Sequence, residues 1–243
     1  MPGLNFRKCK VGDLVLSYGF NPAGGAQGVV KTFKALTILP AMVSAAQGGK
    51  TAFAGAANAN HAMIITKIIG PARGMPDDSA KIFAHAANAG VDSDDLNSFL
   101  GAGSGACQVF RMKGEFDFAA RAGAVAETWT PRDETASRRM VYATGKAICS
   151  AFQSSSFGSG AKQRAAFYRQ HAATRGGPTD LQNMKQGRAK AMFCSMFVIA
   201  CYQAVMSDMY CEQMLALDAK HTTPMYLDGY LKGSQHWERV DAN

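Results

Sequence analysis

One run of sequence sets the architecture expected for this chain: Asn60-His61-Ala62-Met63-Ile64-Ile65-Thr66-Lys67-Ile68-Ile69. Apolar side chains occupy odd and even positions alike, which is typical of a strand that is buried on both faces of a sheet. A second strand-like segment covers residues 81–87, and the intervening residues 70–78 are rich in Gly, Pro and Asp. We therefore predict an antiparallel hairpin, with its first strand near the centre of a sheet.

Shorter segments on either side of the hairpin complete the predicted fold. Residues 11–17 and 108–112 have the short apolar pattern of further strands. Later in the chain, apolar residues recur at a spacing of three and four, which predicts helices from Thr130-Pro131 to about residue 148 and over residues 188–205. The expected fold class is α+β, with a small antiparallel sheet packed against helices.

Length and composition favour a single domain over residues 1–243. The chain is 47% hydrophobic, enough to bury a sizeable core. Residues 20–58 are rich in Gly and Ala and have a helix-like middle near residues 30–46. We interpret this segment as an insertion or a flap over the domain.

The charge balance and the cysteine pattern exclude several classes of protein. The net charge of +8 favours polyanionic surroundings, but no tight basic run with interleaved aromatic residues predicts specific nucleic-acid binding. No apolar run has the length of a membrane span, and the N-terminus lacks the pattern of a secretory signal peptide. The six cysteines include no Cys-x-x-Cys pair, so we expect free thiols rather than a disulfide framework or a zinc ribbon.

Two histidines of the predicted hairpin form a candidate catalytic pair. A register with His61 opposite His85 and Ile65 opposite Lys81 puts both imidazoles on one face of the sheet, where facing Cβ atoms are about 4.5–5.5 Å apart. One imidazole could act as a base while the other orients it. The alternative is that the two are unrelated core-edge histidines. The other three are expected at the surface: His171, His221 and His236.

A cysteine late in the chain is the candidate nucleophile. Cys194 lies in the run Met192-Phe193-Cys194-Ser195-Met196-Phe197-Val198, and an imidazole can take the proton of its thiol. The alternative is a small buried hydrophobe, because Cys194 shares an apolar helical stripe with Phe197 and Cys201. A helix that starts near residue 188 would also leave the thiol far from the helix N-terminus. No metal or other cofactor is predicted, since no short-range ligand pair supports one.

The order of these motifs resembles the circularly permuted form of the NlpC-type papain-like cell-wall peptidases. Gly12-Asp13-Leu14-Val15-Leu16 comes first, the histidine strand follows, and Ile82-Phe83-Ala84-His85-Ala86 is similar to the strand that carries the third catalytic residue. Phe193-Cys194-Ser195 is similar to the start of the family's cysteine helix, with a departure at Met196, where an acidic residue is frequent. The resemblance implies a permuted papain-like fold with the cysteine on a helix of the C-terminal half.

The resemblance also implies a function. It makes Cys194 the nucleophile, His61 the base and His85 the orienting residue of a hydrolase that cleaves amide bonds through a thioester. The substrate it implies is a peptidoglycan peptide, or another peptide or acyl group. The missing signal suggests an effector toxin that is cytoplasmic in its producer, leaves by a signal-independent secretion system with a delivery or immunity protein, and acts in a target periplasm. Two alternatives stay open, a lipid acyltransferase or thioesterase of the lecithin:retinol acyltransferase type and a non-catalytic binding protein on the same scaffold.

Overall fold

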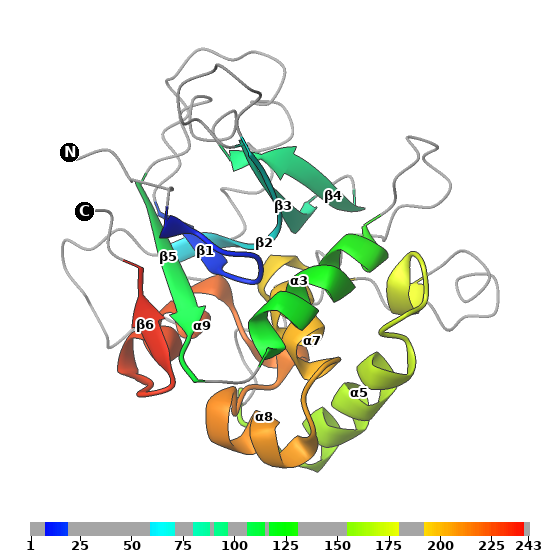
Figure 1. The fold of residues 1–243 in the computed structure, drawn as a ribbon. Coiled ribbons are helices and arrows are strands. Elements are labelled where there is room, and N and C mark those ends of the chain that lie inside the picture. The colour runs from blue at the N-terminus through cyan, green and yellow to red at the C-terminus, as the bar shows by residue number, and fades with distance from the viewer. Residues whose placement is uncertain are drawn as a thin grey trace.

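The computed structural model describes eight stretches of the chain: residues 8–18, 59–70, 80–87, 90–96, 106–114, 117–130, 155–179 and 192–240. Within them, an antiparallel sheet lies against a group of helices, which confirms the predicted α+β class (Figure 1). The predicted flap at residues 20–58 and the predicted helix over residues 131–148 lie outside the described residues.

The sheet has six strands in the order β4-β3-β2-β1-β5-β6. Their bounds are β1 Leu14–Tyr18, β2 Ala59–Ile69, β3 Ala80–Ala87, β4 Gly90–Asp95, β5 Ala106–Met112 and β6 Trp237–Arg239. The predicted hairpin is present as β2 and β3, and β2 lies inside the sheet between β1 and β3. The sequence analysis did not predict β4 or β6, whose short and polar segments lack a clear strand pattern.

The helices contact the sheet mainly through its central strand. Their bounds are α3 Phe118–Trp129, α5 Ser159–Gln170, α7 Cys194–Gln203, α8 Asp208–Met214 and α9 Pro224–Gly233, with short 3-10 turns at η3 Gly177–Thr179 and η4 Ala219–His221. Helices α3, α7 and α9 contact β2, and α5 packs against α7 (Figure 1). This arrangement brings the late helix α7 to the early histidine strand.

The two faces of the sheet bury two separate apolar clusters. The helix-side core combines alternate strand residues such as Ala62 and Ile64 with helix residues such as Phe197. The outer core has eight buried members: Cys9, Val15, Met63, Ile65, Phe83, Leu96, Cys107 and Val109. Successive residues of a strand point to opposite faces, so β2 supplies both clusters in turn. This confirms the prediction that β2 is buried on both faces.

The Gly-Asp turn before β1 closes one end of the hairpin strand. Gly12 has φ +90°, and a Cβ added there would lie 2.0 Å from the carbonyl oxygen of Ala119 in α3. Its N–H donates to the carbonyl of Ile65, and its own carbonyl accepts from the buried hydroxyl of Tyr202 in α7. Only glycine combines this backbone conformation with so close an approach. The turn therefore joins β1, β2, α3 and α7.

The aspartate of the same turn is buried beside an arginine of β5. Both oxygens of Asp13 accept hydrogen bonds from Arg111, at 2.9 and 2.7 Å. Arg111 also donates to the carbonyl of Lys8, and the N–H of Val240 donates to the carbonyl of Val109. Strand β5 thus holds both ends of the described part of the chain.

The register of the hairpin differs from the prediction by two residues. The pairs are Ile64 with Ala84 and Ile65 with Phe83, so Ile65 does not face Lys81. An irregularity between residues 65 and 67 then shifts the pairing by one more residue toward the loop. A shift of two residues keeps every side chain on its face, whereas a shift of one would not. The predicted register is wrong, but the prediction that both histidines lie on the same face of the sheet is unaffected.

Candidate functional site

The two histidines of the hairpin are in direct contact. Nε2 of His61 lies 2.7 Å from Nδ1 of His85, a hydrogen bond in which one ring nitrogen must carry the proton. The rings meet edge to face, with centroids 5.0 Å apart, and both residues are buried. This confirms the prediction that the hairpin places the two imidazoles side by side. The bond lies just beyond the last backbone pair of β2 and β3, Ile64 with Ala84.

Strand alternation assigns both histidines to the outer face of the sheet. His61 alternates with Met63 and Ile65, which belong to the outer core. His85 alternates with Phe83, and the rings of His85 and Phe83 are 5.1 Å apart at their centroids. The pair His61 and His85, called the dyad below, therefore lies next to apolar side chains, an environment that disfavours a charged imidazole.

Burial controls the protonation of His61. The pKa of His61 is lowered well below its ordinary value, first by burial and second by the charge of His85. His61 is consequently neutral near pH 7. A neutral imidazole has one nitrogen with a lone pair, which is the form that a general base requires.

A carboxylate lies on the other side of the second histidine. Nε2 of His85 is 3.5 Å from Oδ2 of Asp94 in β4. The hydrogen bond from His85 lowers the pKa of Asp94 and keeps its carboxylate ionised. This partner of His85 is not predictable from the sequence patterns, because the contact depends on the pairing of β3 with β4, a strand that those patterns do not indicate.

Cys194 is the first residue of helix α7. The preceding residue, Phe193, is extended (φ −112°, ψ 169°), and its carbonyl accepts from the N–H of Phe197. The prediction of a helix over residues 188–205 is therefore wrong at its start, because α7 begins at Cys194. Phe193 offers no side-chain cap but is buried in the helix-side core, which fixes this boundary by packing. The boundary puts the thiol at the positive end of the helix dipole.

The thiol of Cys194 lies against the backbone of the histidine strand. Hydrogen bonds from the N–H groups of Ala62, Ser195 and Cys194 itself lower its pKa, but burial outweighs them and raises it to about 11. Ala62 directly follows His61 in the strand. Cys194 belongs to the helix-side core, so its thiol approaches β2 from the face where Ala62 and Ile64 pack. Because His61 lies on the outer face, strand alternation places the thiol and the imidazole of His61 on opposite faces of β2, beside consecutive residues of the strand.

A second cysteine shares the face of the dyad. Cys107 of β5 is paired with Ser17 of β1, and Ser17 is paired with His61, so the three side chains form a row across the sheet. Burial raises the pKa of the Cys107 thiol to about 12. No role for Cys107 is predicted from the sequence, since only the register of three strands reveals this relation. Cys201, the other cysteine of α7, is fully buried and burial raises its pKa as well.

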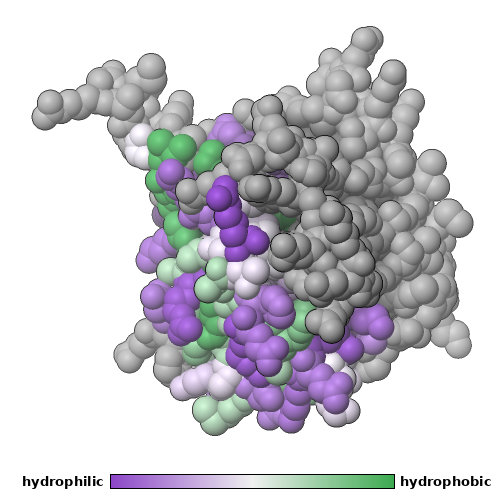
Figure 2. All heavy atoms as spheres, turned by 90° about the vertical axis from the view of Figure 1, so that its right-hand side faces the viewer, coloured by the Kyte–Doolittle hydropathy of each residue, from purple (hydrophilic) through white to green (hydrophobic). Residues whose placement is uncertain are grey.

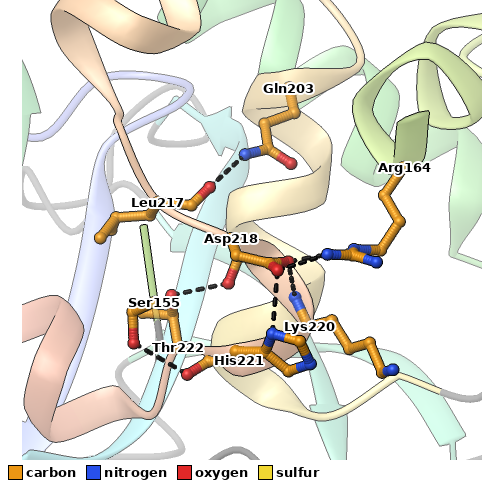
Figure 3. A network of polar contacts seen from close by, with 8 residues as sticks. All are labelled: Ser155, Arg164, Gln203, Leu217, Asp218, Lys220, His221 and Thr222. Carbon is orange, nitrogen blue, oxygen red and sulfur yellow. Dashed lines mark hydrogen bonds and ion pairs between the residues drawn. The ribbon is translucent and has the colours of Figure 1, made fainter. Parts of the chain in front are cut away.

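A polar network holds the segment that supports the start of α7. The buried carboxylate of Asp218 accepts from Arg164 of α5 and lies 2.9 Å from Nδ1 of His221 (Figure 3). Ser155 accepts from the N–H of Asp218 and donates its hydroxyl to the carbonyl of His221. His221 was predicted at the surface, but it is an internal member of this network.

The network continues toward the cysteine. The buried hydroxyl of Ser195 donates to the carbonyl of Thr222 at 2.6 Å, one residue after His221. Gln203, at the end of α7, donates to the carbonyl of Leu217 on the same segment (Figure 3). Both ends of α7 are thus bonded to the chain around Asp218. The arrangement fixes the position of the helix end that carries Cys194.

Other kinds of site find no support in the described part of the chain. No cluster of three or more His, Cys, Asp or Glu side chains there could hold a metal ion. None of the helices described is long and apolar enough to cross a bilayer. On the described part of the face in Figure 2, hydrophilic residues alternate with small hydrophobic groups. Among the described residues, the dyad and the thiol at the start of α7 remain the candidate site.

Comparisons with family models, with curated proteins and with solved structures find no match to this chain.

Proposed function

We propose that this protein is a cysteine hydrolase with a circularly permuted papain-like fold, which cleaves amide bonds through a thioester. One observation carries the proposal. The thiol of Cys194, at the N-terminus of α7, accepts a hydrogen bond from the N–H of Ala62, and the adjacent His61 is bonded to His85. A nucleophile, a base and a group that orients the base are the parts of a triad.

The proposed reaction begins with a proton transfer from the thiol to His61, for which the two side chains, on opposite faces of β2, must meet around the strand beside Ala62. Since Nε2 of His61 faces His85, Nδ1 is the nitrogen that takes the proton. The sulfur attacks the amide carbonyl, a carbon–sulfur bond forms, and His61 then gives its proton to the leaving amine as the carbon–nitrogen bond breaks. Water next attacks the thioester with His61 as base. The acid is released and the thiol is restored.

The electrostatics of the site favour a neutral resting state. Burial raises the pKa of Cys194 and lowers that of His61, so neither charge is favoured before the substrate arrives. Proton transfer between the two groups leaves the net charge of the site unchanged. The helix N-terminus supports the thiolate, and the backbone N–H of Cys194 is one donor for the oxyanion of the tetrahedral intermediate.

The proposed substrate is a peptide of peptidoglycan. The net charge of +8 suits an anionic cell-wall polymer, and the order of the motifs is that of permuted cell-wall peptidases. We further propose an effector toxin that acts in the periplasm of a target cell, with an immunity or delivery protein as partner. This part of the proposal rests on the sequence resemblance rather than on the geometry of the site.

Digestion of purified peptidoglycan tests the proposal. Wild-type protein should release soluble peptide fragments, and Cys194→Ala should release none. Cys201→Ala is the matched control on the same helix and should keep the activity. Cys107→Ala should keep it too, because Cys107 stands across the sheet and not at a helix N-terminus.

The other outcomes separate the alternatives. If Cys107→Ala loses the activity and Cys194→Ala keeps it, the nucleophile is Cys107 and the proposed role of Cys194 is wrong. Release or transfer of acyl chains from lipid vesicles, without peptide release, would favour a lipid acyltransferase. If neither substrate reacts and no thioester adduct is found by mass spectrometry, the protein is a binding protein on this scaffold.

A further inference from the structure

The ring nitrogens of His85 face two different groups. Nδ1 lies 2.7 Å from Nε2 of His61, and Nε2 lies 3.5 Å from Oδ2 of Asp94. The side chain of His85 is 5% exposed, whereas that of Asp94 is 60% exposed. The contacts therefore form a chain that leads from a carboxylate in water to a buried imidazole.

The chemistry of the groups fixes the direction of these hydrogen bonds. An ionised carboxylate only accepts, so a neutral His85 must donate from Nε2 to Asp94. Its Nδ1 then carries the lone pair and must accept, which requires that His61 donate from Nε2. A neutral His61 has a single N–H, so its Nδ1 is left with the lone pair.

We propose that Asp94 is a positioning residue, which selects the tautomers of His85 and His61 so that Nδ1 of His61 is the basic nitrogen. Its catalytic meaning rests on the function proposed above, since Nδ1 is the atom that takes the thiol proton there. The pattern of tautomers is itself independent of turnover. Asp94 acts only through His85 and does not touch the reacting atoms.

Two aspartates of β4 lie on the same face as His85. Asp92 stands directly opposite His85 in the backbone register, and its Oδ1 accepts the N–H of Ser93. Asp94 is paired with Phe83, two residues along the strand, and its Oδ2 lies 3.5 Å from Nε2 of His85. The measured contact with the ring nitrogen is the reason to assign the role to Asp94.

Nitrogen NMR of protein labelled at histidine tests the proposal directly. The nitrogen resonances of a neutral imidazole separate the protonated nitrogen from the one with a lone pair. In wild-type protein at pH 7, the protonated nitrogen should be Nε2 in both His61 and His85. In Asp94→Lys the ammonium group donates to Nε2 of His85, so both rings should change to the Nδ1-protonated form. Asp94→Glu should keep the wild-type pattern.

A charge-matched variant serves as control. Asp117 precedes α3, is exposed and makes no side-chain cap bond, so Asp117→Lys changes the net charge equally and should leave both tautomers unchanged. Identical histidine spectra for Asp94→Lys and Asp117→Lys would overturn the proposal. A wild-type spectrum with Nδ1 protonated in His85 would overturn it too.

The kinetic readout separates this proposal from the one on which it rests. If the hydrolase is real, Asp94→Lys should lower kcat about tenfold with little change in KM, because the wrong nitrogen then carries the proton. Asp94→Glu should restore the rate. If the tautomers are as expected but the protein hydrolyses nothing, the proposed function is refuted and the positioning role of Asp94 is supported. If the wild-type enzyme is active and Asp94→Lys changes neither the tautomers nor kcat, the positioning role of Asp94 is refuted and the proposed function is not.

Discussion

Two regions of strand β2 differ in what their polar groups do. In the region around Ile65, backbone groups bond to the Gly-Asp turn, with the N–H of Gly12 donating to Ile65 and the N–H of Ile65 donating to Asp13. In the region around His61, the imidazole bonds to His85 and the N–H of Ala62 bonds to the thiol of Cys194. The first region, here called the Gly12 end, holds the fold together, and the second, the His61 end, presents groups that can react.

The difference shows where changes should affect stability and where they should affect activity. The backbone groups of Gly12 are satisfied by the carbonyl of Ile65 and by the hydroxyl of Tyr202, so loss of these contacts should destabilise the protein. Groups around His61 are buried side chains with lowered or raised pKa values, which is typical of a functional site. Mutations near Gly12 should therefore mainly lower stability, whereas mutations near His61 should mainly lower activity.

The largest expected effect is on activity, at the His61 end. His61→Ala removes the proposed base and should lower the rate of the proposed amide hydrolysis by about 10³-fold, within the range of general-base catalysis. The urea midpoint should change much less than in the variants at the Gly12 end. His236→Ala, on a histidine outside the site, is the control and should keep the rate. Equal rates for the two variants would mean that His61 is not the base.

The second effect is on stability, at the Gly12 end. Gly12→Ala puts a Cβ 2.0 Å from the carbonyl of Ala119 and strains a backbone with φ +90°. We expect a loss of at least about 3 kcal/mol in the free energy of unfolding, from overpacking and backbone strain together. Urea denaturation followed by circular dichroism measures it. Gly70→Ala, just after β2 ends at Ile69, meets nothing within 4 Å and should change stability by less than about 0.5 kcal/mol.

A smaller loss is expected when one hydrogen bond to the turn is removed. Tyr202→Phe deletes the hydroxyl that donates to the carbonyl of Gly12 and leaves that buried carbonyl without this donor. The expected cost is about 1–2 kcal/mol, measured by the same denaturation. Tyr226→Phe changes an exposed tyrosine and should cost nothing measurable. If both variants lose a similar free energy of unfolding, the loss in Tyr202→Phe is not due to its hydrogen bond with Gly12.

The smallest effect concerns acid. The pKa of His61 is lowered in the folded protein, so below its unfolded pKa of about 6.5 the unfolded chain binds more protons and stability falls as the pH falls. Between pH 7 and 5.5 this contribution is about 1 kcal/mol. His61→Gln should lack this pH-dependent contribution to the free energy of unfolding. The difference in stability between wild type and His61→Gln should therefore shrink or reverse toward pH 5.5. His236→Gln should follow the wild-type pH profile.

The hairpin and its dyad were predictable, whereas the partners around them were not. The alternation along residues 61–65 and 83–86 fixes which face each side chain takes, and that face was right even though the register was wrong. The irregularity at Thr66 leaves no trace in the sequence, so the pairs with Lys81 could not be placed. Asp94 and Cys107 come to the dyad only through the order of strands across the sheet.

The start of the cysteine helix shows a different limit. Helix periodicity extends before Cys194, and no Ser, Thr, Asp or Asn marks a cap, so the sequence predicts an earlier start. The structure sets the boundary by burying Phe193 in an extended conformation within the helix-side core. Tertiary packing, which one sequence does not display, decides whether the thiol lies at the helix N-terminus.

The position of β5 has a consequence for engineering. Lys8 and Val240 are both bonded to β5, through Arg111 and Val109, so a short linker could join these two points of the chain. Opening the chain between η3 and α7 would then yield a rearranged protein that starts with the cysteine helix. In that protein the cysteine helix would come before the Gly-Asp turn and the histidine strand. A library of such rearrangements would ask whether the order in which the elements are synthesised matters for this sheet, or only their final places in it.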